Sequence, residues 1–182
     1  MSKSFDELWR FINTRSSVIT VQERSELNYV YDLMRGAASY LEVGTAEGNS
    51  LYVLSHAIKP GGVISYIDYG EKHTALPRNE IIALLHNEGI EVAGYLGNSH
   101  DPKTYSATMP YDVVLIDAGH SYEDVIADAI AYGRFATKYL IFHDICLPEV
   151  ERAFEWYCKQ RSLNKAYKFI NSDTFGYGIL KL

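Results

Sequence analysis

The sequence contains few cysteines, no cluster of basic residues and no long apolar run. Its two cysteines, Cys146 and Cys158, stand outside any CxxC pair, so we expect reduced thiols and no disulfide framework. Seventeen Lys and Arg against 23 Asp and Glu give a formal charge of -6, which argues against electrostatic binding of nucleic acid or membranes. No segment approaches the roughly 18 apolar residues of a membrane span, and the N-terminus lacks the apolar core of a signal peptide. We therefore expect a cytoplasmic protein.

The chain has the length and composition of one globular domain. At about 150 residues per domain, 182 residues leave no room for a second one. Hydrophobic residues make up 47% and charged residues 22% of the sequence, as in ordinary globular proteins. No internal repeat or Pro/Gly-rich linker interrupts it. We predict a single domain over residues 1–182.

Helical and strand patterns alternate along the chain. Two S/T-x-x-E capping boxes, Ser4 to Glu7 and Thr20 to Glu23, precede apolar residues at helical spacing and predict two N-terminal helices. Short apolar runs predict strands at 40–43, 63–67, 92–96, 113–116, 139–142, 167–170 and 176–182. Helical spacing predicts helices at 51–58, 80–86, 122–132 and from 148 onward, with a loop at 70–78.

This alternation predicts an α/β fold. Nearly continuous apolar strands are buried on both faces, and right-handed crossovers through helices make such strands parallel. The expected fold is a Rossmann-like, doubly wound, mostly parallel sheet of seven strands, with helices on both faces and a C-terminal antiparallel hairpin. In such a sheet, ligands bind at the carboxyl ends of the strands, so the turn after the first strand is the place to look for a site.

The turn after the first strand reads EVGTAEGNS over residues 42–50. The dinucleotide fingerprint G-x-G-x-x-G requires a glycine where Ala46 stands, so a pyrophosphate cradle is poorly supported. Glu42 offers a carboxylate for a cationic group, and Asp68, at the end of the second strand, can accept hydrogen bonds from a ribose diol. Together these acids favour a nucleoside that carries positive charge.

The segment from Glu42 to Gly48 resembles the E-x-G-x-x-x-G first motif of class I S-adenosylmethionine-dependent methyltransferases. The chain is most similar to their metal-dependent O-methyltransferases of the catechol type and to related macrolide-sugar O-methyltransferases. Asp68 falls where that family has its ribose-binding acid, and the sequence GNSHD at 97–101 resembles its adenine-contacting G-x-S-x-D segment. Asp117 follows the fourth strand, where the family also has an acid.

The resemblance, which extends over residues 35–182, implies S-adenosylmethionine as the cofactor. It implies that helices within residues 1–37 cover the site and that residues 38–182 form the nucleoside-binding core. The implied cofactor-binding residues are Glu42, Gly44, Thr45, Gly48, Ser50, Asp68, Ser99, His100 and Asp117.

The fourth and fifth strands end in residues that suit a metal site. In the resembled O-methyltransferases, an acid at the position of Asp117 and a pair at the positions of His143 and Asp144 hold a divalent cation such as Mg²⁺ or Mn²⁺. The first member of that pair is usually acidic, so His143 weakens the all-oxygen site that Mg²⁺ prefers and favours a metal that accepts imidazole. The alternative role for His143 is a hydrogen bond that orients Asp144.

His120, three residues after Asp117, is the expected general base. Methyl transfer to a hydroxyl requires aligned oxygen, methyl and sulfur atoms and removal of the hydroxyl proton. The resembled enzymes have a Lys or His at this position as the proposed base, and imidazole accepts a proton near neutral pH. The alternative is a turn residue before a helix capped by Ser121.

The favoured function is O-methylation of a small hydroxylated acceptor, with no nucleic acid or membrane partner. One alternative is a noncatalytic nucleoside-binding module, which His143 leaves open. The other is an NAD-dependent oxidoreductase on the same fold, against which Ala46 and the lack of a Tyr-x-x-x-Lys pair count. The aromatic C-terminal helix and hairpin would suit a homo-oligomer interface.

Overall fold

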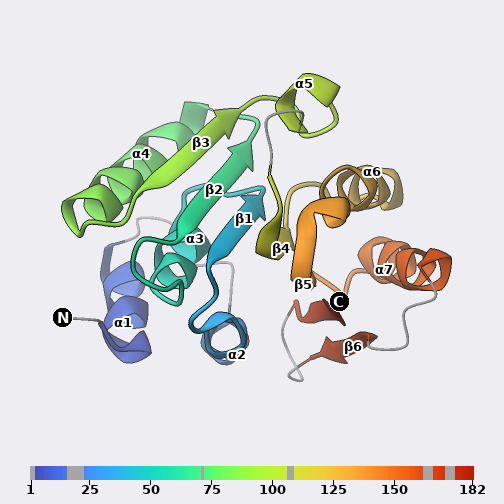
Figure 1. Cartoon of the computed structure of the whole chain (residues 1–182), viewed down its shortest axis with the longest axis horizontal. Coiled ribbons are helices and arrows are strands. Elements are labelled where there is room, and N and C mark those ends of the chain that lie inside the picture. The colour runs from blue at the N-terminus through green and yellow to red at the C-terminus, as the bar shows by residue number, and fades with distance from the viewer. Residues whose placement is uncertain (1–2, 16–22, 71, 106–108, 162–165, 171–174) are drawn as a thin grey trace.

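The computed structural model describes residues 3–15, 23–70, 72–105, 109–161, 166–170 and 175–182 (Figure 1). The helices are α1 (Phe5–Arg15), α2 (Arg24–Met34), α3 (Asn49–Ser55), α4 (Lys72–Asn87), α5 (Pro102–Tyr105), α6 (Tyr122–Tyr132), the short 3-10 helix η1 (Gly133–Phe135) and α7 (Pro148–Gln160). The strands are β1 (Ser39–Val43), β2 (Val63–Asp68), β3 (Val92–Leu96), β4 (Tyr111–Ile116), β5 (Ala136–His143), β6 (Ala166–Phe169) and β7 (Tyr177–Lys181).

The seven strands form one sheet in the order β3-β2-β1-β4-β5-β7-β6. The first five strands are parallel, and β7 runs antiparallel to both β5 and β6. Val43 at the end of β1 is in register with Ile67 of β2 and Ile116 of β4, so these strands end at one edge of the sheet. The strand order reverses between β1 and β4, which is where doubly wound sheets bind ligands. The structure therefore confirms the predicted fold.

The hydrophobic core has two layers, one on each face of the sheet. Tyr40 and Val113 are fully buried on the face covered by α1 to α4, whereas Leu41 and Val114 are fully buried against α6 and α7. Figure 1 shows these helices flanking the twisted sheet. Because successive strand residues point to opposite faces, burial on both faces explains the continuous apolar runs of the central strands. None of the described helices is both long and apolar enough to cross a membrane.

The two capping boxes have different outcomes. The Ser4 backbone N–H donates to Glu7 Oε2 at 2.7 Å, and the Glu7 N–H donates weakly back to Ser4 Oγ at 3.4 Å, as a capping box requires. The second box is wrong, because α2 begins at Arg24 with Glu23 as its N-cap and no side-chain cap bond. Thr20 itself lies outside the described residues.

The predicted loop at residues 70–78 is also wrong, because α4 begins at Lys72 and contains Pro77. Proline disfavours a helix interior, which is why the sequence indicated a later start. Packing outweighs this local preference: Arg78 is 1% exposed, and Ile81 and Leu85 are buried against the sheet.

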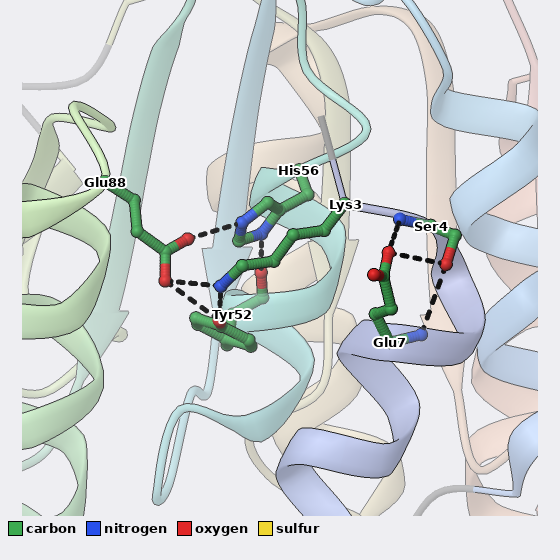
Figure 2. A network of polar contacts seen from close by, with 6 residues as sticks. All are labelled: Lys3, Ser4, Glu7, Tyr52, His56 and Glu88. Atoms are coloured by element: carbon green, nitrogen blue, oxygen red, sulfur yellow. Dashed lines mark hydrogen bonds and ion pairs between the residues drawn. The ribbon is translucent and has the colours of Figure 1, made fainter. Parts of the chain in front are cut away.

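A polar network ties the N-terminal segment to α3 and α4 (Figure 2). Lys3 Nζ donates to Glu88 Oε1 and to the Tyr52 hydroxyl, both at 2.6 Å. His56 Nε2 lies 2.7 Å from Glu88 Oε2, and its Nδ1 lies 2.8 Å from the Tyr52 carbonyl oxygen. These residues border the start of β2, at the opposite end of the sheet from the bend after β1. We therefore assign this network to holding the helix layer together.

Candidate functional site

A cavity of about 390 Å³ opens at the carboxyl ends of the parallel strands. Its walls come from the carboxyl end of β2 and from the turns after β1, β3 and β4, which contribute Asp68, Gly44, Ser99 and Asp117. Tyr69, which follows Asp68 and is 73% exposed, also lines the cavity and offers a flat aromatic face. Sequence reasoning missed Tyr69 among the many tyrosines.

The bend after β1 requires glycine at two positions. Gly44 has φ +88°, and a Cβ there would lie 2.3 Å from the Asp117 carbonyl oxygen, so only glycine lets β1 and β4 end so close together. Gly48 has φ +85° and caps the N-terminus of α3. The bend thus brings backbone next to the cavity, and binding of a ligand there stays a prediction.

Glu42 and Ser50 lie under the bend and do not line the cavity. The Glu42 carboxylate is fully buried and accepts hydrogen bonds from the Tyr40 hydroxyl at 2.6 Å and from Ser50 Oγ at 2.5 Å. Burial raises the pKa of Glu42 to about 7. Thr45 is buried as well, and its backbone N–H points to Asp68. The expected role of Glu42 at a cationic group remains a prediction.

Asp68 is held by four donors. Its Oδ2 accepts from the backbone N–H groups of Thr45 at 3.1 Å and Ala46 at 2.9 Å. Its Oδ1 accepts from the Gly70 N–H at 2.8 Å and from Arg78 Nη1 at 2.6 Å. A carboxylate has about four lone-pair positions, so a ribose diol would have to replace one of these bonds.

Ser99 and His100 line the end of the cavity next to α6. His100 Nε2 lies 3.5 Å from Asp128 Oδ1 and 3.9 Å from Asp124 Oδ1. Asp128 is 1% exposed, and burial raises the pKa of its carboxyl to about 6. Sequence reasoning missed Asp128, although an acid at helical spacing between Val125, Ala129 and Tyr132 interrupts an apolar helix face and was a usable signal.

The other polar cluster combines residues from the ends of β4 and β5. His120 Nε2 lies 2.6 Å from Asp144 Oδ2, and His143 Nδ1 lies 2.9 Å from Asp117 Oδ1 and 3.4 Å from Asp144 Oδ1. Asp144 has φ +56°, an unfavourable conformation for a residue with a side chain, which indicates that the surrounding contacts fix it. Because Asp117 also lines the cavity, this cluster borders it.

Charge pairing decides the protonation states in this cluster. Burial alone would lower the pKa of His143, but the carboxylates of Asp117 and Asp144 raise it to about 10. Burial would raise the pKa of Asp144, but hydrogen bonds from His120 and His143 hold it well below its usual range. The hydrogen bond with Asp144 raises the pKa of His120 above 6.5. The two carboxylates therefore favour the protonated form of His143.

The predicted metal ligands Asp117, His143 and Asp144 lie close together, and His120 lies beside the two acids as well. Ligand atoms of Asp117, His120 and Asp144 all lie within 4.8 Å of one another, whereas His143 directs Nδ1 at the two carboxylates. Two carboxylates and an imidazole suit a cation such as Mn²⁺ better than Mg²⁺. The two carboxylates therefore fit a divalent cation, and the His120 imidazole is a third group within reach of it, while the predicted role of His143 as a ligand stays a prediction.

The sheet order, the glycine bend and the cavity beside it define a Rossmann-like protein with the methyltransferase arrangement of strands. Residues 41–145, more than half of the chain, match the family model described as a methyltransferase domain. The chain therefore belongs to this methyltransferase family. A search of curated protein sequences found no match.

Solved structures with the same fold include several O-methyltransferases. The O-methyltransferase from Bacillus cereus in complex with SAH has a TM-score of 0.72 and 15% identity, with 98% of this chain and 90% of that chain covered. The O-methyltransferase TomG from Streptomyces achromogenes, in complex with SAM, has a TM-score of 0.68 and 14% identity, with 98% and 87% covered. CalS11, a TDP-rhamnose 3'-O-methyltransferase, has a TM-score of 0.65 and 14% identity, with 97% and 92% covered. At these identities the likeness establishes the fold.

Proposed function

We propose that the protein transfers a methyl group from S-adenosylmethionine to a hydroxyl group of a small acceptor. The donor would lie in the cavity after β1, with its adenine near Tyr69, Ser99 and His100. Its ribose would take one of the four lone-pair positions on Asp68 that are now occupied. Support comes from the family match and from the SAH and SAM complexes among proteins of the same fold.

The observation that carries the catalytic proposal is the contact between His120 Nε2 and the Asp144 carboxylate. With Nε2 held by Asp144 at 2.6 Å, Nδ1 is the ring nitrogen left to accept a proton. S-adenosylmethionine would supply the methyl group and keep the electron pair of the broken carbon–sulfur bond on its sulfur, and His120 Nδ1 would take up the proton of the acceptor hydroxyl. Asp144 holds the imidazole in one tautomer and stabilises its protonated form.

A divalent cation fits beside this base. Asp117 and Asp144 would hold it, and it would lower the pKa of the acceptor hydroxyl. His120 cannot use Nε2 for a metal and for Asp144 at the same time, so the base role leaves the carboxylates as the principal ligands. His143 then keeps the two carboxylates in place from the buried side.

The chemistry of the acceptor follows from what surrounds the site. The net charge of -6 and the paired carboxylates disfavour a polyanionic polymer as acceptor. A sugar or another polyhydroxylated small molecule fits best, as in the TDP-rhamnose 3'-O-methyltransferase of the same fold.

Both cysteines are free thiols, in keeping with a reducing cytoplasm.

Transfer of a labelled methyl group tests this function. The protein is incubated with labelled S-adenosylmethionine and a panel of hydroxylated sugars and phenols, with Mn²⁺ or with a chelator. We expect label in at least one acceptor and its loss in His120→Gln. Binding of S-adenosylmethionine without transfer to any acceptor would favour a nucleoside-binding module, and binding of NAD alone would favour the oxidoreductase.

A further inference from the structure

Ala46 occupies a position in the bend where the backbone is left-handed. Its φ is +45°, and it is one of two described non-glycine residues with positive φ, the other being Asp144. A residue with a Cβ disfavours this conformation, whereas glycine adopts it readily. Ala46 also lines the cavity, so its conformation shapes the surface that a donor meets. Something in the fold must therefore hold this peptide in place.

Both backbone polar groups of Ala46 form hydrogen bonds, one with Asp68 and the other with Arg78. The Ala46 N–H donates to Asp68 Oδ2 at 2.9 Å, and the Ala46 carbonyl oxygen accepts from Arg78 Nη1 at 3.1 Å. The same Arg78 nitrogen donates to Asp68 Oδ1 at 2.6 Å, which closes a ring of contacts. The bend, the end of β2 and α4 are thereby connected at one point.

The setting of Arg78 makes this contact rigid. Its side chain is 1% exposed, and the guanidinium lies 5.9 Å from the centroid of the Tyr66 ring. A buried guanidinium is costly unless it is paired, so its ion pair with Asp68, whose side chain is 10% exposed, is strongly preferred. The side chain comes from the part of α4 that the sequence indicated to be a loop.

We infer that Arg78 is a positioning residue for the methyl donor, because it holds Ala46 in the left-handed bend and fixes the Asp68 carboxylate. The inference rests on the proposed function, since it concerns the binding of the donor. Arg78 acts through Ala46 and Asp68 and does not line the cavity. Loss of its contacts lets Ala46 leave the left-handed region, so donor binding must then restore the bend and becomes weaker.

The test combines two substitutions and measures SAH affinity by calorimetry. Arg78→Met is expected to weaken binding by about tenfold, the penalty for restoring a left-handed alanine. The affinity of Ala46→Gly alone is measured as the reference for the double variant, because Ala46 itself lines the cavity. In the double variant, glycine removes the penalty and should recover most of the lost affinity. This rescue separates positioning of the bend from a general structural role, which Ala46→Gly would not repair.

Controls keep the outcomes distinct. Arg35→Met removes an exposed arginine that pairs with Asp32 far from the bend, and it should not change affinity. If Arg78→Met does not fold, Arg78→Lys retains the charge and should give a smaller loss that Ala46→Gly again repairs. Unchanged or tighter SAH binding by the folded Arg78 variant, or no rescue by Ala46→Gly, would overturn this inference but not the proposed function. Absence of SAH binding by the wild-type protein would instead contradict the proposed function, and the inference with it.

Discussion

His120 Nε2 lies 2.6 Å from Asp144 Oδ2, although His120 follows strand β4 and Asp144 follows strand β5. The parallel pairing of these strands brings their ends to one edge of the sheet, so a turn residue after β4 reaches the first residue after β5. His120 is half exposed, whereas Asp144 is nearly buried. The pair therefore presents an imidazole to solvent with a carboxylate fixed behind it, which is the arrangement that a general base requires.

Replacing His120 with glutamine is expected to lower kcat by about a hundredfold or more, because it removes the proton acceptor. SAH affinity should stay near the wild-type value, since the substitution leaves the cavity lining intact. In the wild-type protein, the rate should rise with pH through a pKa above 6.5, because Asp144 raises the pKa of His120. Asp144→Asn should move this inflection to lower pH. Equal kcat in wild type and His120→Gln would remove His120 as the base.

Asp128→Asn is expected to stabilise the protein at pH 8. Burial raises the pKa of Asp128 from 3.8 to about 6, so the folded state binds the proton more tightly than the unfolded state does. The ionised carboxyl therefore costs stability above pH 6, and this cost disappears as the pH falls toward 4. The variant should gain about 1–3 kcal/mol in free energy of unfolding at pH 8, and less at pH 5.

Urea unfolding at the two pH values measures this difference. Asp124→Asn is the matched control, because Asp124 faces the same His100 ring but is 45% exposed in its side chain, and it should change little at either pH. A loss of stability in Asp128→Asn that is larger at pH 8 would mean that the contacts of the carboxylate, with His100 among them, outweigh the cost of burying it.

The glycine bend provides a steric test with a built-in control. Gly44 and Gly36 both have positive φ, at +88° and +80°, but only at Gly44 would a Cβ meet backbone, 2.3 Å from the Asp117 carbonyl oxygen. Gly36→Ala should cost about 1–2 kcal/mol of stability from φ alone. Gly44→Ala should cost more, because the ends of β1 and β4 must also separate, and it should abolish SAH binding. Equal losses in stability would show that the close approach has no energetic consequence.

Manganese titration, followed by electron paramagnetic resonance, identifies the ligands of a divalent cation. Asp117→Asn should weaken Mn²⁺ binding by about tenfold or more, because it removes a carboxylate from the cluster. His143→Gln should leave binding unchanged or make it tighter, because the glutamine amide can still donate a hydrogen bond to the carboxylates while the positive charge that competes for them is removed. Loss of Mn²⁺ binding in His143→Gln would restore His143 as a ligand.

The sequence predicts a strand well where apolar residues run along its whole length, and less well where polar residues begin it. Residues 92–96 and 122–132 have the predicted bounds of β3 and α6. β5 begins earlier than predicted, at Ala136, because its first residues include the exposed Thr137 and Lys138 and so lack an apolar run. The sequence also missed the start of α4. Pro77 disfavours a helix locally, and the burial of Arg78, which favours the helix, depends on the tertiary structure.

Some residues of the site could be predicted from the sequence, and others could not. Residues at strand ends, such as Asp68 and Asp117, could be placed together because parallel strands share an edge. Arg78 and Asp128 could not, because their roles depend on which face of a helix meets a particular turn. The grouping of His120 with the two acids likewise depends on side-chain directions that spacing does not determine.

Calorimetric titration of the wild-type protein with SAH, and separately with NAD, tests the central claim most directly. We predict saturable binding of SAH at one site per chain and no binding of NAD, with SAH binding lost in Gly44→Ala. Binding of NAD without binding of SAH would contradict the proposal that the bend after β1 accepts a methyl donor.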